Sequence, residues 1–303
     1  MRFLFNPVRE RPRLWRAASA ALGRLFSNGM NILFPPICLS CRKNLGKENA
    51  SLFNKNLCAD CAPKIEIASG FLCPKCLRRL PELKSAGWRT CHPETKFVLG
   101  AASSYQNAVV REIIHSLKYQ KIKAAAGVLG QILFIYLSKI LQNSDWNFEN
   151  FLVIPIPLHP KKQKERGFNQ SSLIAESLLE KMNPVRGRPA EGSATSTSSS
   201  LKALQSLNGL GRSASNGMNL LGLQTDNLVK TKNTQSQTQL QNFEEREQNV
   251  AASFALKNPA SVKNKNIVLI DDVFTSGATM KEAVKVLKSA GAKKIIALVV
   301  ARA

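Results

Sequence analysis

The chain is poor in acidic residues, histidines and aromatic residues. Its 303 residues include 43 Lys or Arg against 20 Asp or Glu, which gives a formal net charge of +23 at neutral pH. This deficit of negative charge favours polyanionic partners such as phosphates, nucleotides or nucleic acid, although it could also serve solubility alone. With three histidines in the chain, no Ser/His/Asp catalytic arrangement has support from the sequence.

Long hydrophobic runs are also missing. A transmembrane helix needs about 18 apolar residues, and the densest run, residues 17–22, is broken by Ser19. We therefore expect no integral membrane protein. The apolar content of 44% is ordinary for a globular chain and supports a sizeable core, which argues against a mainly disordered chain. The length predicts one large domain with a smaller unit.

Cysteine is absent outside residues 38–91, where all seven cysteines lie and six form Cys-x-x-Cys pairs. The odd number argues against a disulfide framework. Thiolates two residues apart on a tight turn can both bind one tetrahedral Zn²⁺, and two such turns complete a site. The first two pairs are separated by 16 residues, a spacing typical of zinc ribbons. The predicted zinc ligands are Cys38, Cys41, Cys58 and Cys61.

A second zinc site in the same module has only three thiols. Its candidate ligands are Cys73, Cys76, Cys91 and His92. Two ligands that are adjacent in sequence, Cys91 and His92, are geometrically awkward. The sequence alone therefore does not decide whether this second site binds zinc. Because reduced cysteines are typical of reducing compartments, we expect a cytoplasmic protein.

The chain divides into three parts. Residues 1–34 carry six Arg and one Glu, and their apolar spacing predicts a basic helical extension that could rest on lipid or nucleic acid or simply pack on the protein. The zinc-ribbon module follows at 35–95 and the main domain at 96–303. Residues 184–226 are rich in Ser, Gly and Asn, and we expect them to form a disordered insertion.

The main domain has the apolar pattern of an α/β protein. Strands alternate with helices, which predicts a parallel sheet covered by helices on both faces. The expected strands are 151–156, 266–271 and 295–300, and the expected helices are about 109–118, 124–141, 169–182 and 280–290.

The most informative stretch joins a buried strand to a helix. The strand delivers Asp271 and Asp272 to the carboxyl edge of the sheet, where open α/β sheets bind ligands. These carboxylates can accept hydrogen bonds from sugar hydroxyls or bind Mg²⁺. The following turn presents backbone N–H groups, hydroxyls and a helix N-terminus to one phosphate. Its residues are Thr275, Ser276, Gly277, Ala278 and Thr279.

Residues 267–279 resemble the phosphoribosyl-pyrophosphate (PRPP) signature of type I phosphoribosyltransferases, with Ser276 where that family commonly has Thr. The resemblance implies that Asp271 and Asp272 contact the ribose hydroxyls. It also implies that the turn 275–279 holds the 5′-phosphate.

Two further segments are similar to the ComF (GntX) family. Residues 153–170 resemble its pyrophosphate-binding region, and their cations at the same sheet edge are Lys161, Lys162, Lys164 and Arg166. Seen alone, these could be a solvated basic loop. Residues 228–254 resemble its mobile loop through Arg246 and Asn249, although the spacing is one residue longer than usual. The position of the cysteine module before the transferase domain also fits this family.

The resemblance implies a transferase. Pyrophosphate would leave C1 of PRPP as a nitrogen nucleophile attacks, with Mg²⁺ bound to PRPP, and no motif identifies the acceptor. The alternative is an accessory protein of competence that binds single-stranded DNA and uses the PRPP site as a sensor. Residues 1–130 carry 21 basic and seven acidic side chains, which favours DNA phosphates, but aromatic residues for base stacking are few.

Overall fold

The computed structural model describes residues 36–45, 53, 56–81, 90–142, 151–182, 220–234 and 249–303. The predicted helical extension at 1–34, most of the predicted insertion, and Arg246 lie outside these residues.

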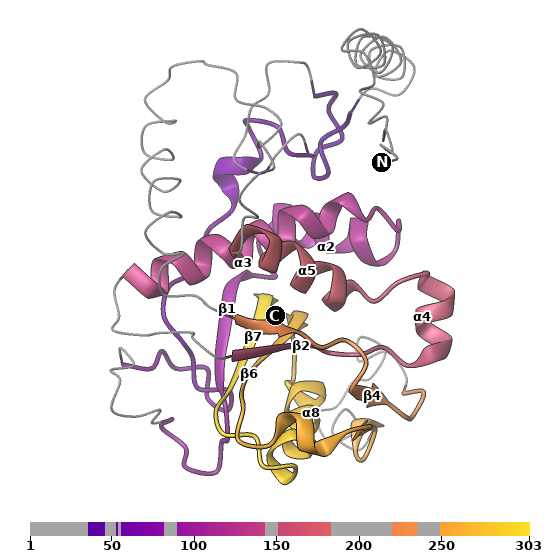
Figure 1. Cartoon of the computed structure of the whole chain (residues 1–303). Coiled ribbons are helices and arrows are strands. Elements are labelled where there is room, and N and C mark those ends of the chain that lie inside the picture. Colours follow the sequence, from indigo (N-terminus) through magenta and orange to yellow (C-terminus); the bar gives the residue numbers. More distant parts are fainter. Residues whose placement is uncertain are drawn as a thin grey trace, which may run out of the picture.

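A five-stranded sheet forms the centre of the main domain, with strand order β1-β7-β6-β2-β3. Each neighbouring pair of strands is parallel, which confirms the predicted fold class (Figure 1). The strands are β1 (Val98–Ser104), β2 (Phe151–Pro155), β3 (Leu220–Leu223), β6 (Asn266–Phe274) and β7 (Ile295–Arg302). A separate antiparallel pair consists of β4 (Leu228–Lys230) and β5 (Phe254–Leu256).

Helices cover both faces of the sheet. On one face lie α2 (Ala108–Lys118), α3 (Ala124–Gln142) and α5 (Gln170–Met182), and on the other lies α8 (Ala278–Ser289) (Figure 1). Strand β6 is continuously apolar from Ile267 to Ile270 because both of its faces are covered there. Val268 and Ile270 belong to the core under α3 and α5, whereas Ile267 and Leu269 belong to the core under α8. A strand buried on both faces reads as a continuous apolar run.

Helix α3 corrects one expectation from the sequence. Among the described residues it is long and apolar enough to cross a membrane, although no such segment was expected. However, 67% of its most apolar 18-residue window is buried inside the fold. It packs against α5 so closely that a Cβ atom at Gly130 would lie 2.5 Å from Ser177 Oγ. Its apolar composition therefore matches its place in the core.

Strand β3 lies within residues 184–226, where we expected a disordered insertion. It pairs with β2 at the edge of the sheet. The order continues beyond it, because Gln224 N donates to Val153 O at 2.9 Å and Asn227 Nδ2 donates to Ser261 Oγ at 2.8 Å. The predicted insertion therefore does not extend to Leu220 or beyond it.

Candidate functional site

The cysteine module contains two turns of the same construction. In the first turn, Cys38 N donates to Lys43 O at 2.8 Å, and in the second, Cys73 N donates to Arg78 O at 2.9 Å. Each turn has a left-handed residue after its second cysteine, Arg42 (φ 62°) in one and Leu77 (φ 58°) in the other. These hydrogen bonds fold each Cys-x-x-Cys segment tightly enough for both thiols to face one point.

The first cluster brings together all four of its predicted ligands. The sulfur atoms of Cys38, Cys41, Cys58 and Cys61 lie within 4.8 Å of one another. Cys41 Sγ and Cys58 Sγ are 3.6 Å apart, close to the ~3.8 Å edge of a tetrahedron with Zn–S bonds of about 2.3 Å. Although burial opposes it, backbone N–H donors that include Cys58 N lower the pKa of the Cys38 thiol to about 7. This group fits a zinc ion.

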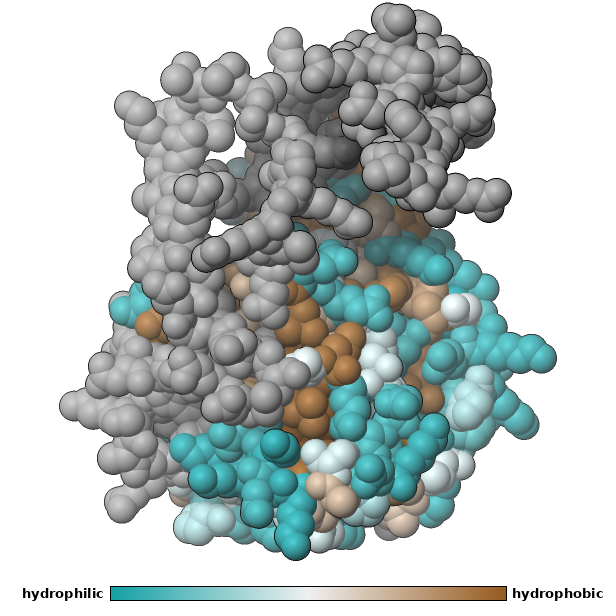
Figure 2. Space-filling model, viewed as in Figure 1, coloured by the Kyte–Doolittle hydropathy of each residue, from teal (hydrophilic) through white to brown (hydrophobic). Residues whose placement is uncertain are grey.

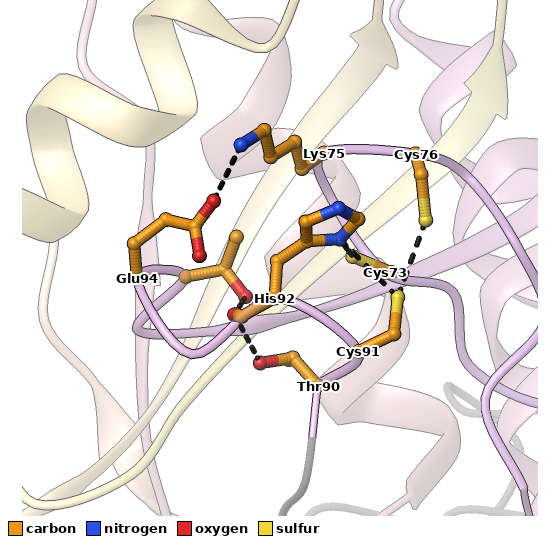
Figure 3. Close-up of polar contacts among 8 residues, drawn as sticks. Cys73, Lys75, Cys76, Thr90, Cys91, His92 and Glu94 are labelled. Carbon is orange, nitrogen blue, oxygen red and sulfur yellow. Dashed lines mark hydrogen bonds and ion pairs between the residues drawn. The ribbon is translucent and has the colours of Figure 1, made fainter.

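The second cluster is also complete, with His92 as its fourth donor (Figure 3). His92 Nδ1 lies 3.4 Å from Cys73 Sγ and 3.3 Å from Cys91 Sγ. The expected difficulty of adjacent ligands is resolved by the loop, because the hydroxyls of Thr90 and Thr95 both donate to the carbonyl oxygen of His92. Cys91 and His92 thereby face the same point, and this group could also bind zinc.

The cysteine module is fastened to the main domain at both turns. Leu72, next to the second turn, exchanges two backbone hydrogen bonds with Leu99 of β1, at 2.7 and 3.0 Å. Arg42 of the first turn donates to Glu112 Oε1 at 3.3 Å and to Ser116 Oγ at 3.1 Å, both on α2. The first cysteine turn therefore contacts the helix whose last residue, Lys118, enters the site described next.

The two predicted carboxylates lie near the carboxyl end of β6, beyond the point where β2 ends. Asp272 is 3% exposed, and its Oδ2 atom is 2.9 Å from the ammonium of Lys118. Asp271 Oδ1 accepts hydrogen bonds from Ser171 Oγ and from Asp272 N, both at 2.9 Å. Elements α2, α5 and β6 thus meet at this carboxylate pair.

Burial and mutual repulsion shape the charges of the pair. Burial, reinforced by the charge of Asp272, raises the pKa of Asp271 to about 7. Burial works against the charged form of Lys118, but the carboxylates of Asp272 and Asp271 outweigh it and raise the pKa of Lys118. The ammonium therefore stays charged and compensates Asp272, while Asp271 is balanced between its two protonation states near neutral pH.

The turn 275–279 connects β6 to α8 as the sequence predicts. Gly277 is the N-cap of α8 and has a left-handed φ of 74°. A Cβ atom at this position would lie 2.4 Å from the ring of Phe274, so both the backbone and the packing require glycine. The N-terminal end of α8 is thereby aimed at the carboxyl edge of the sheet, where backbone N–H groups suit a phosphate.

The predicted basic loop is in fact a short helix, α4 (Pro160–Arg166). His159 is its N-cap, with Nδ1 accepting from Lys161 N at 3.3 Å, and the helix ends at Gly167 in a left-handed conformation. Helix formation separates the predicted cations. Lys161 and Lys164 are exposed, whereas Lys162 and Arg166 are half-buried.

The structure brings two lysines to this region that the sequence did not predict as ligands. Lys118 is one, and Lys230 of β4 is the other. Burial and the nearby charge of Lys162 lower the pKa of Lys230 to about 8, and its ammonium lies 5.5 Å from the ring centre of Phe254. Lys162 Nζ donates to Thr234 O at 2.7 Å, which ties α4 to the segment that follows β4. The predicted loop residue Asn249 is helical and precedes β5.

Comparison with known proteins identifies the class of this domain. Residues 218–303 match the family model described as the phosphoribosyl transferase domain. These residues include β6, the carboxylate pair and the turn into α8. The fold and the matched segment together define a phosphoribosyltransferase-like domain that is preceded by a module with two cysteine-rich clusters that could each bind a metal ion.

Relatives over nearly the whole chain narrow the assignment. The chain is 24% identical over 268 residues to competence protein ComFC of Bacillus subtilis. The aligned region covers 84% of this chain and 90% of that protein. It is 23% identical over 266 residues to competence protein F of Haemophilus influenzae, with coverages of 81% and 96%. A 52-residue segment is 46% identical to the transcriptional regulator GfcR of Methanosphaera stadtmanae, covering 17% of this chain and 26% of that regulator. These findings support the assignment of the chain to the ComF family.

Proposed function

We propose that the protein binds PRPP together with Mg²⁺ and transfers its phosphoribosyl group to a nitrogen acceptor, with release of pyrophosphate. The observation that carries this proposal is the meeting of the buried Asp271 and Asp272 pair with the turn 275–279 at one edge of the sheet. A ribose 5-phosphate needs hydrogen-bond acceptors for its sugar hydroxyls next to N–H donors for its phosphate, and the carboxylate pair and the turn supply these two groups side by side. Lys118, Lys162 and Lys230 add positive charge around them.

Each part of the site has a distinct task in this reaction, a pentosyl transfer. Asp271 and Asp272 accept hydrogen bonds from the ribose hydroxyls, and the N–H groups of the turn bind the 5′-phosphate. Lys162 and Arg166 face the pyrophosphate with help from the exposed Lys161 and Lys164. Bound Mg²⁺ supplies further neutralisation of the pyrophosphate charge.

The mobile-loop assignment also belongs to this proposal. We expect the segment that contains Arg246 and Asn249 to close over PRPP and exclude water, which would otherwise hydrolyse it. Lys162 already contacts Thr234 at the start of this segment, which supports a connection between the loop and the pyrophosphate cations.

Both cysteine clusters are proposed as structural zinc sites. Four protein donors occupy the tetrahedral positions and leave none open for a substrate. Thiols that bind zinc must stay reduced, which supports a cytoplasmic location. The clusters then maintain the two turns that contact β1 and α2.

A second candidate function is supported by the relatives named competence proteins. In this alternative the protein acts in competence as an accessory that binds single-stranded DNA through its basic surface, and PRPP is sensed without turnover. The match to a transcriptional regulator within the phosphoribosyltransferase segment is compatible with a sensing role. Turnover distinguishes the two candidates.

The test is pyrophosphate release from PRPP and Mg²⁺ with ammonia and a panel of nitrogenous bases as acceptors. We expect release that depends on one acceptor and is lost in Asp272→Asn. Arg166→Ala should weaken binding of PRPP more than binding of ribose 5-phosphate, because the latter lacks pyrophosphate. Binding of PRPP without release for any acceptor would favour the sensor. Equal effects of Arg166→Ala on both ligands would contradict the assigned pyrophosphate position.

A further inference from the structure

A lysine-lined cavity of about 510 Å³ lies between α8 and the second cysteine turn. Lys281 and Lys285 line it from α8, Lys75 lines it from the cysteine turn, and Lys96 lines it from the segment before β1. A second cavity of about 240 Å³ shares Lys96 with the first. It adds Lys288, Lys293 and Lys294 to the lining.

Lysines outnumber carboxylates among the described residues that line these two cavities. Among the described residues that line them, the one carboxylate is that of Glu94, and it is ion-paired with Lys75 (Figure 3). Burial and the nearby charge of Lys96 lower the pKa of Lys288, which shows how closely the cations crowd. A bound anion would relieve this repulsion, and lysines act as point charges for phosphate.

The larger cavity also has an apolar floor. Phe97 and Val284 are 5% and 3% exposed, and Pro74 is buried beside them. Its volume falls within the roughly 300–1,000 Å³ of small-molecule sites, which combine apolar walls with a few charged groups. Phosphate alone would leave these apolar walls unused, whereas a ligand that also carries an aromatic ring would cover them. Hydrophilic side chains cover much of the described surface in the view of Figure 2, including the region of α4 and β4.

Ser276 connects this cavity to the site already described. Ser276 belongs to the turn 275–279 and is also one of the residues that line the cavity. Lys281 lies one helical turn further along, with its backbone N–H bonded to Gly277 O at 2.8 Å. A ligand with its 5′-phosphate on the turn therefore has a cationic cavity next to that phosphate, and neither carboxylate of the pair lines this cavity.

We propose that this cavity is a subsite for phosphoribosyl ligands that are extended at the 5′-phosphate by a second phosphate and a nucleoside. The inference rests on the proposed phosphoribosyl site, because the turn 275–279 holds the shared 5′-phosphate. The lysines contact the added phosphate, and Phe97 and Val284 contact the added aromatic ring.

The test compares ribose 5-phosphate with ADP-ribose, in which ribose is joined through a 5′-diphosphate to adenosine. In isothermal titration calorimetry with Mg²⁺ present, the parent protein should bind ADP-ribose at least about tenfold more tightly than ribose 5-phosphate. This is the gain expected for an added charge-assisted contact. Lys285→Glu and Lys96→Glu should each remove most of this advantage and leave ribose 5-phosphate binding unchanged. Lys257→Glu, at an exposed lysine outside both cavities, should change neither.

Three results separate the two claims. Equal affinity of the parent protein for both ligands overturns the subsite and leaves the phosphoribosyl site standing. An ADP-ribose advantage that survives both Lys285→Glu and Lys96→Glu also overturns the subsite. Failure of both ligands to bind contradicts the proposed function and this inference with it. Lys285→Gln repeats the measurement with a neutral side chain, and thermal melting establishes that each variant is folded.

Discussion

Replacing Lys118 by Met removes the positive partner of the most buried carboxylate in the site. The Lys118 and Asp272 side chains are 20% and 5% exposed, and their charged atoms are 2.9 Å apart. Met has nearly the same length and fills the same volume without charge. The substitution therefore leaves the buried carboxyl group of Asp272 without its charged partner, beside Asp271. Breaking a buried ion pair from one side typically costs about 3–5 kcal/mol.

We expect the free energy of unfolding at pH 7.5 to fall by about 3–5 kcal/mol in Lys118→Met, measured by urea denaturation. The double variant Lys118→Met/Asp272→Asn should recover most of this loss, because position 272 then carries no charge that needs Lys118 as its partner. Lys257→Met, at an exposed lysine, should stay within about 0.5 kcal/mol of the parent.

A loss below about 1 kcal/mol in Lys118→Met would refute the reasoning, because a solvent-exposed pair contributes no more than that. An equal loss in the double variant would also refute it. In that case the cost would come from packing around Lys118 and not from the unpaired carboxylate.

Three further predictions concern the metal clusters, the turn and the carboxylates. Metal analysis should find about two zinc ions per chain, and Cys73→Ser should reduce this to about one; fewer than one in the parent protein would contradict both sites. Gly277→Ala should lower the free energy of unfolding by about 1–3 kcal/mol in urea, because its Cβ meets the Phe274 ring. The folded pKa of Asp271, about 7, is raised above its ordinary value of 3.8, so its stabilising contribution is complete below about pH 4 and is lost as pH rises through 7. Asp271→Asn should therefore gain stability relative to the parent as pH rises from 4 to 8, and a constant difference would contradict the raised pKa.

The parts of the fold that follow from local pattern were predictable. Apolar periodicity located the helices α2, α3, α5 and α8 and three strands of the sheet. Strand β1 was missed because its Gly100, Ala101, Ala102 and Ser103 lack the bulky or branched side chains typical of strands. Helix α4 was missed because it is polar on every side, although Pro160 at its first position was a readable start signal.

The residues of the candidate site were likewise predictable where they lie close in sequence and not where packing brings them together. Asp271, Asp272 and the turn 275–279 lie close together in the sequence, so one strand-to-helix connection places them together. Lys118 and Lys230 come from α2 and β4, and their approach depends on how these elements pack around β6. Spacing within the sequence carries no signal for such contacts.

The same limit applies to the second cysteine cluster. Spacing favoured Cys73 and Cys76 as one half of a site but could not show whether Cys91 and His92 face a common point. Hydrogen bonds from Thr90 and Thr95 to the His92 carbonyl fold this loop, and they involve no metal-binding atom. The sequence therefore predicted the ligand types, and the conformation of the loop decided how they meet.

The central claim is that Asp272 and the turn 275–279 form a phosphoribosyl site. Calorimetric titration of PRPP in Mg²⁺ against the parent protein and Asp272→Asn tests it most directly. We predict one PRPP per chain for the parent and about tenfold or greater weaker binding for Asp272→Asn, the cost of losing a charge-assisted hydrogen bond. Failure of the parent to bind PRPP, or equal affinity of both proteins, would contradict the account.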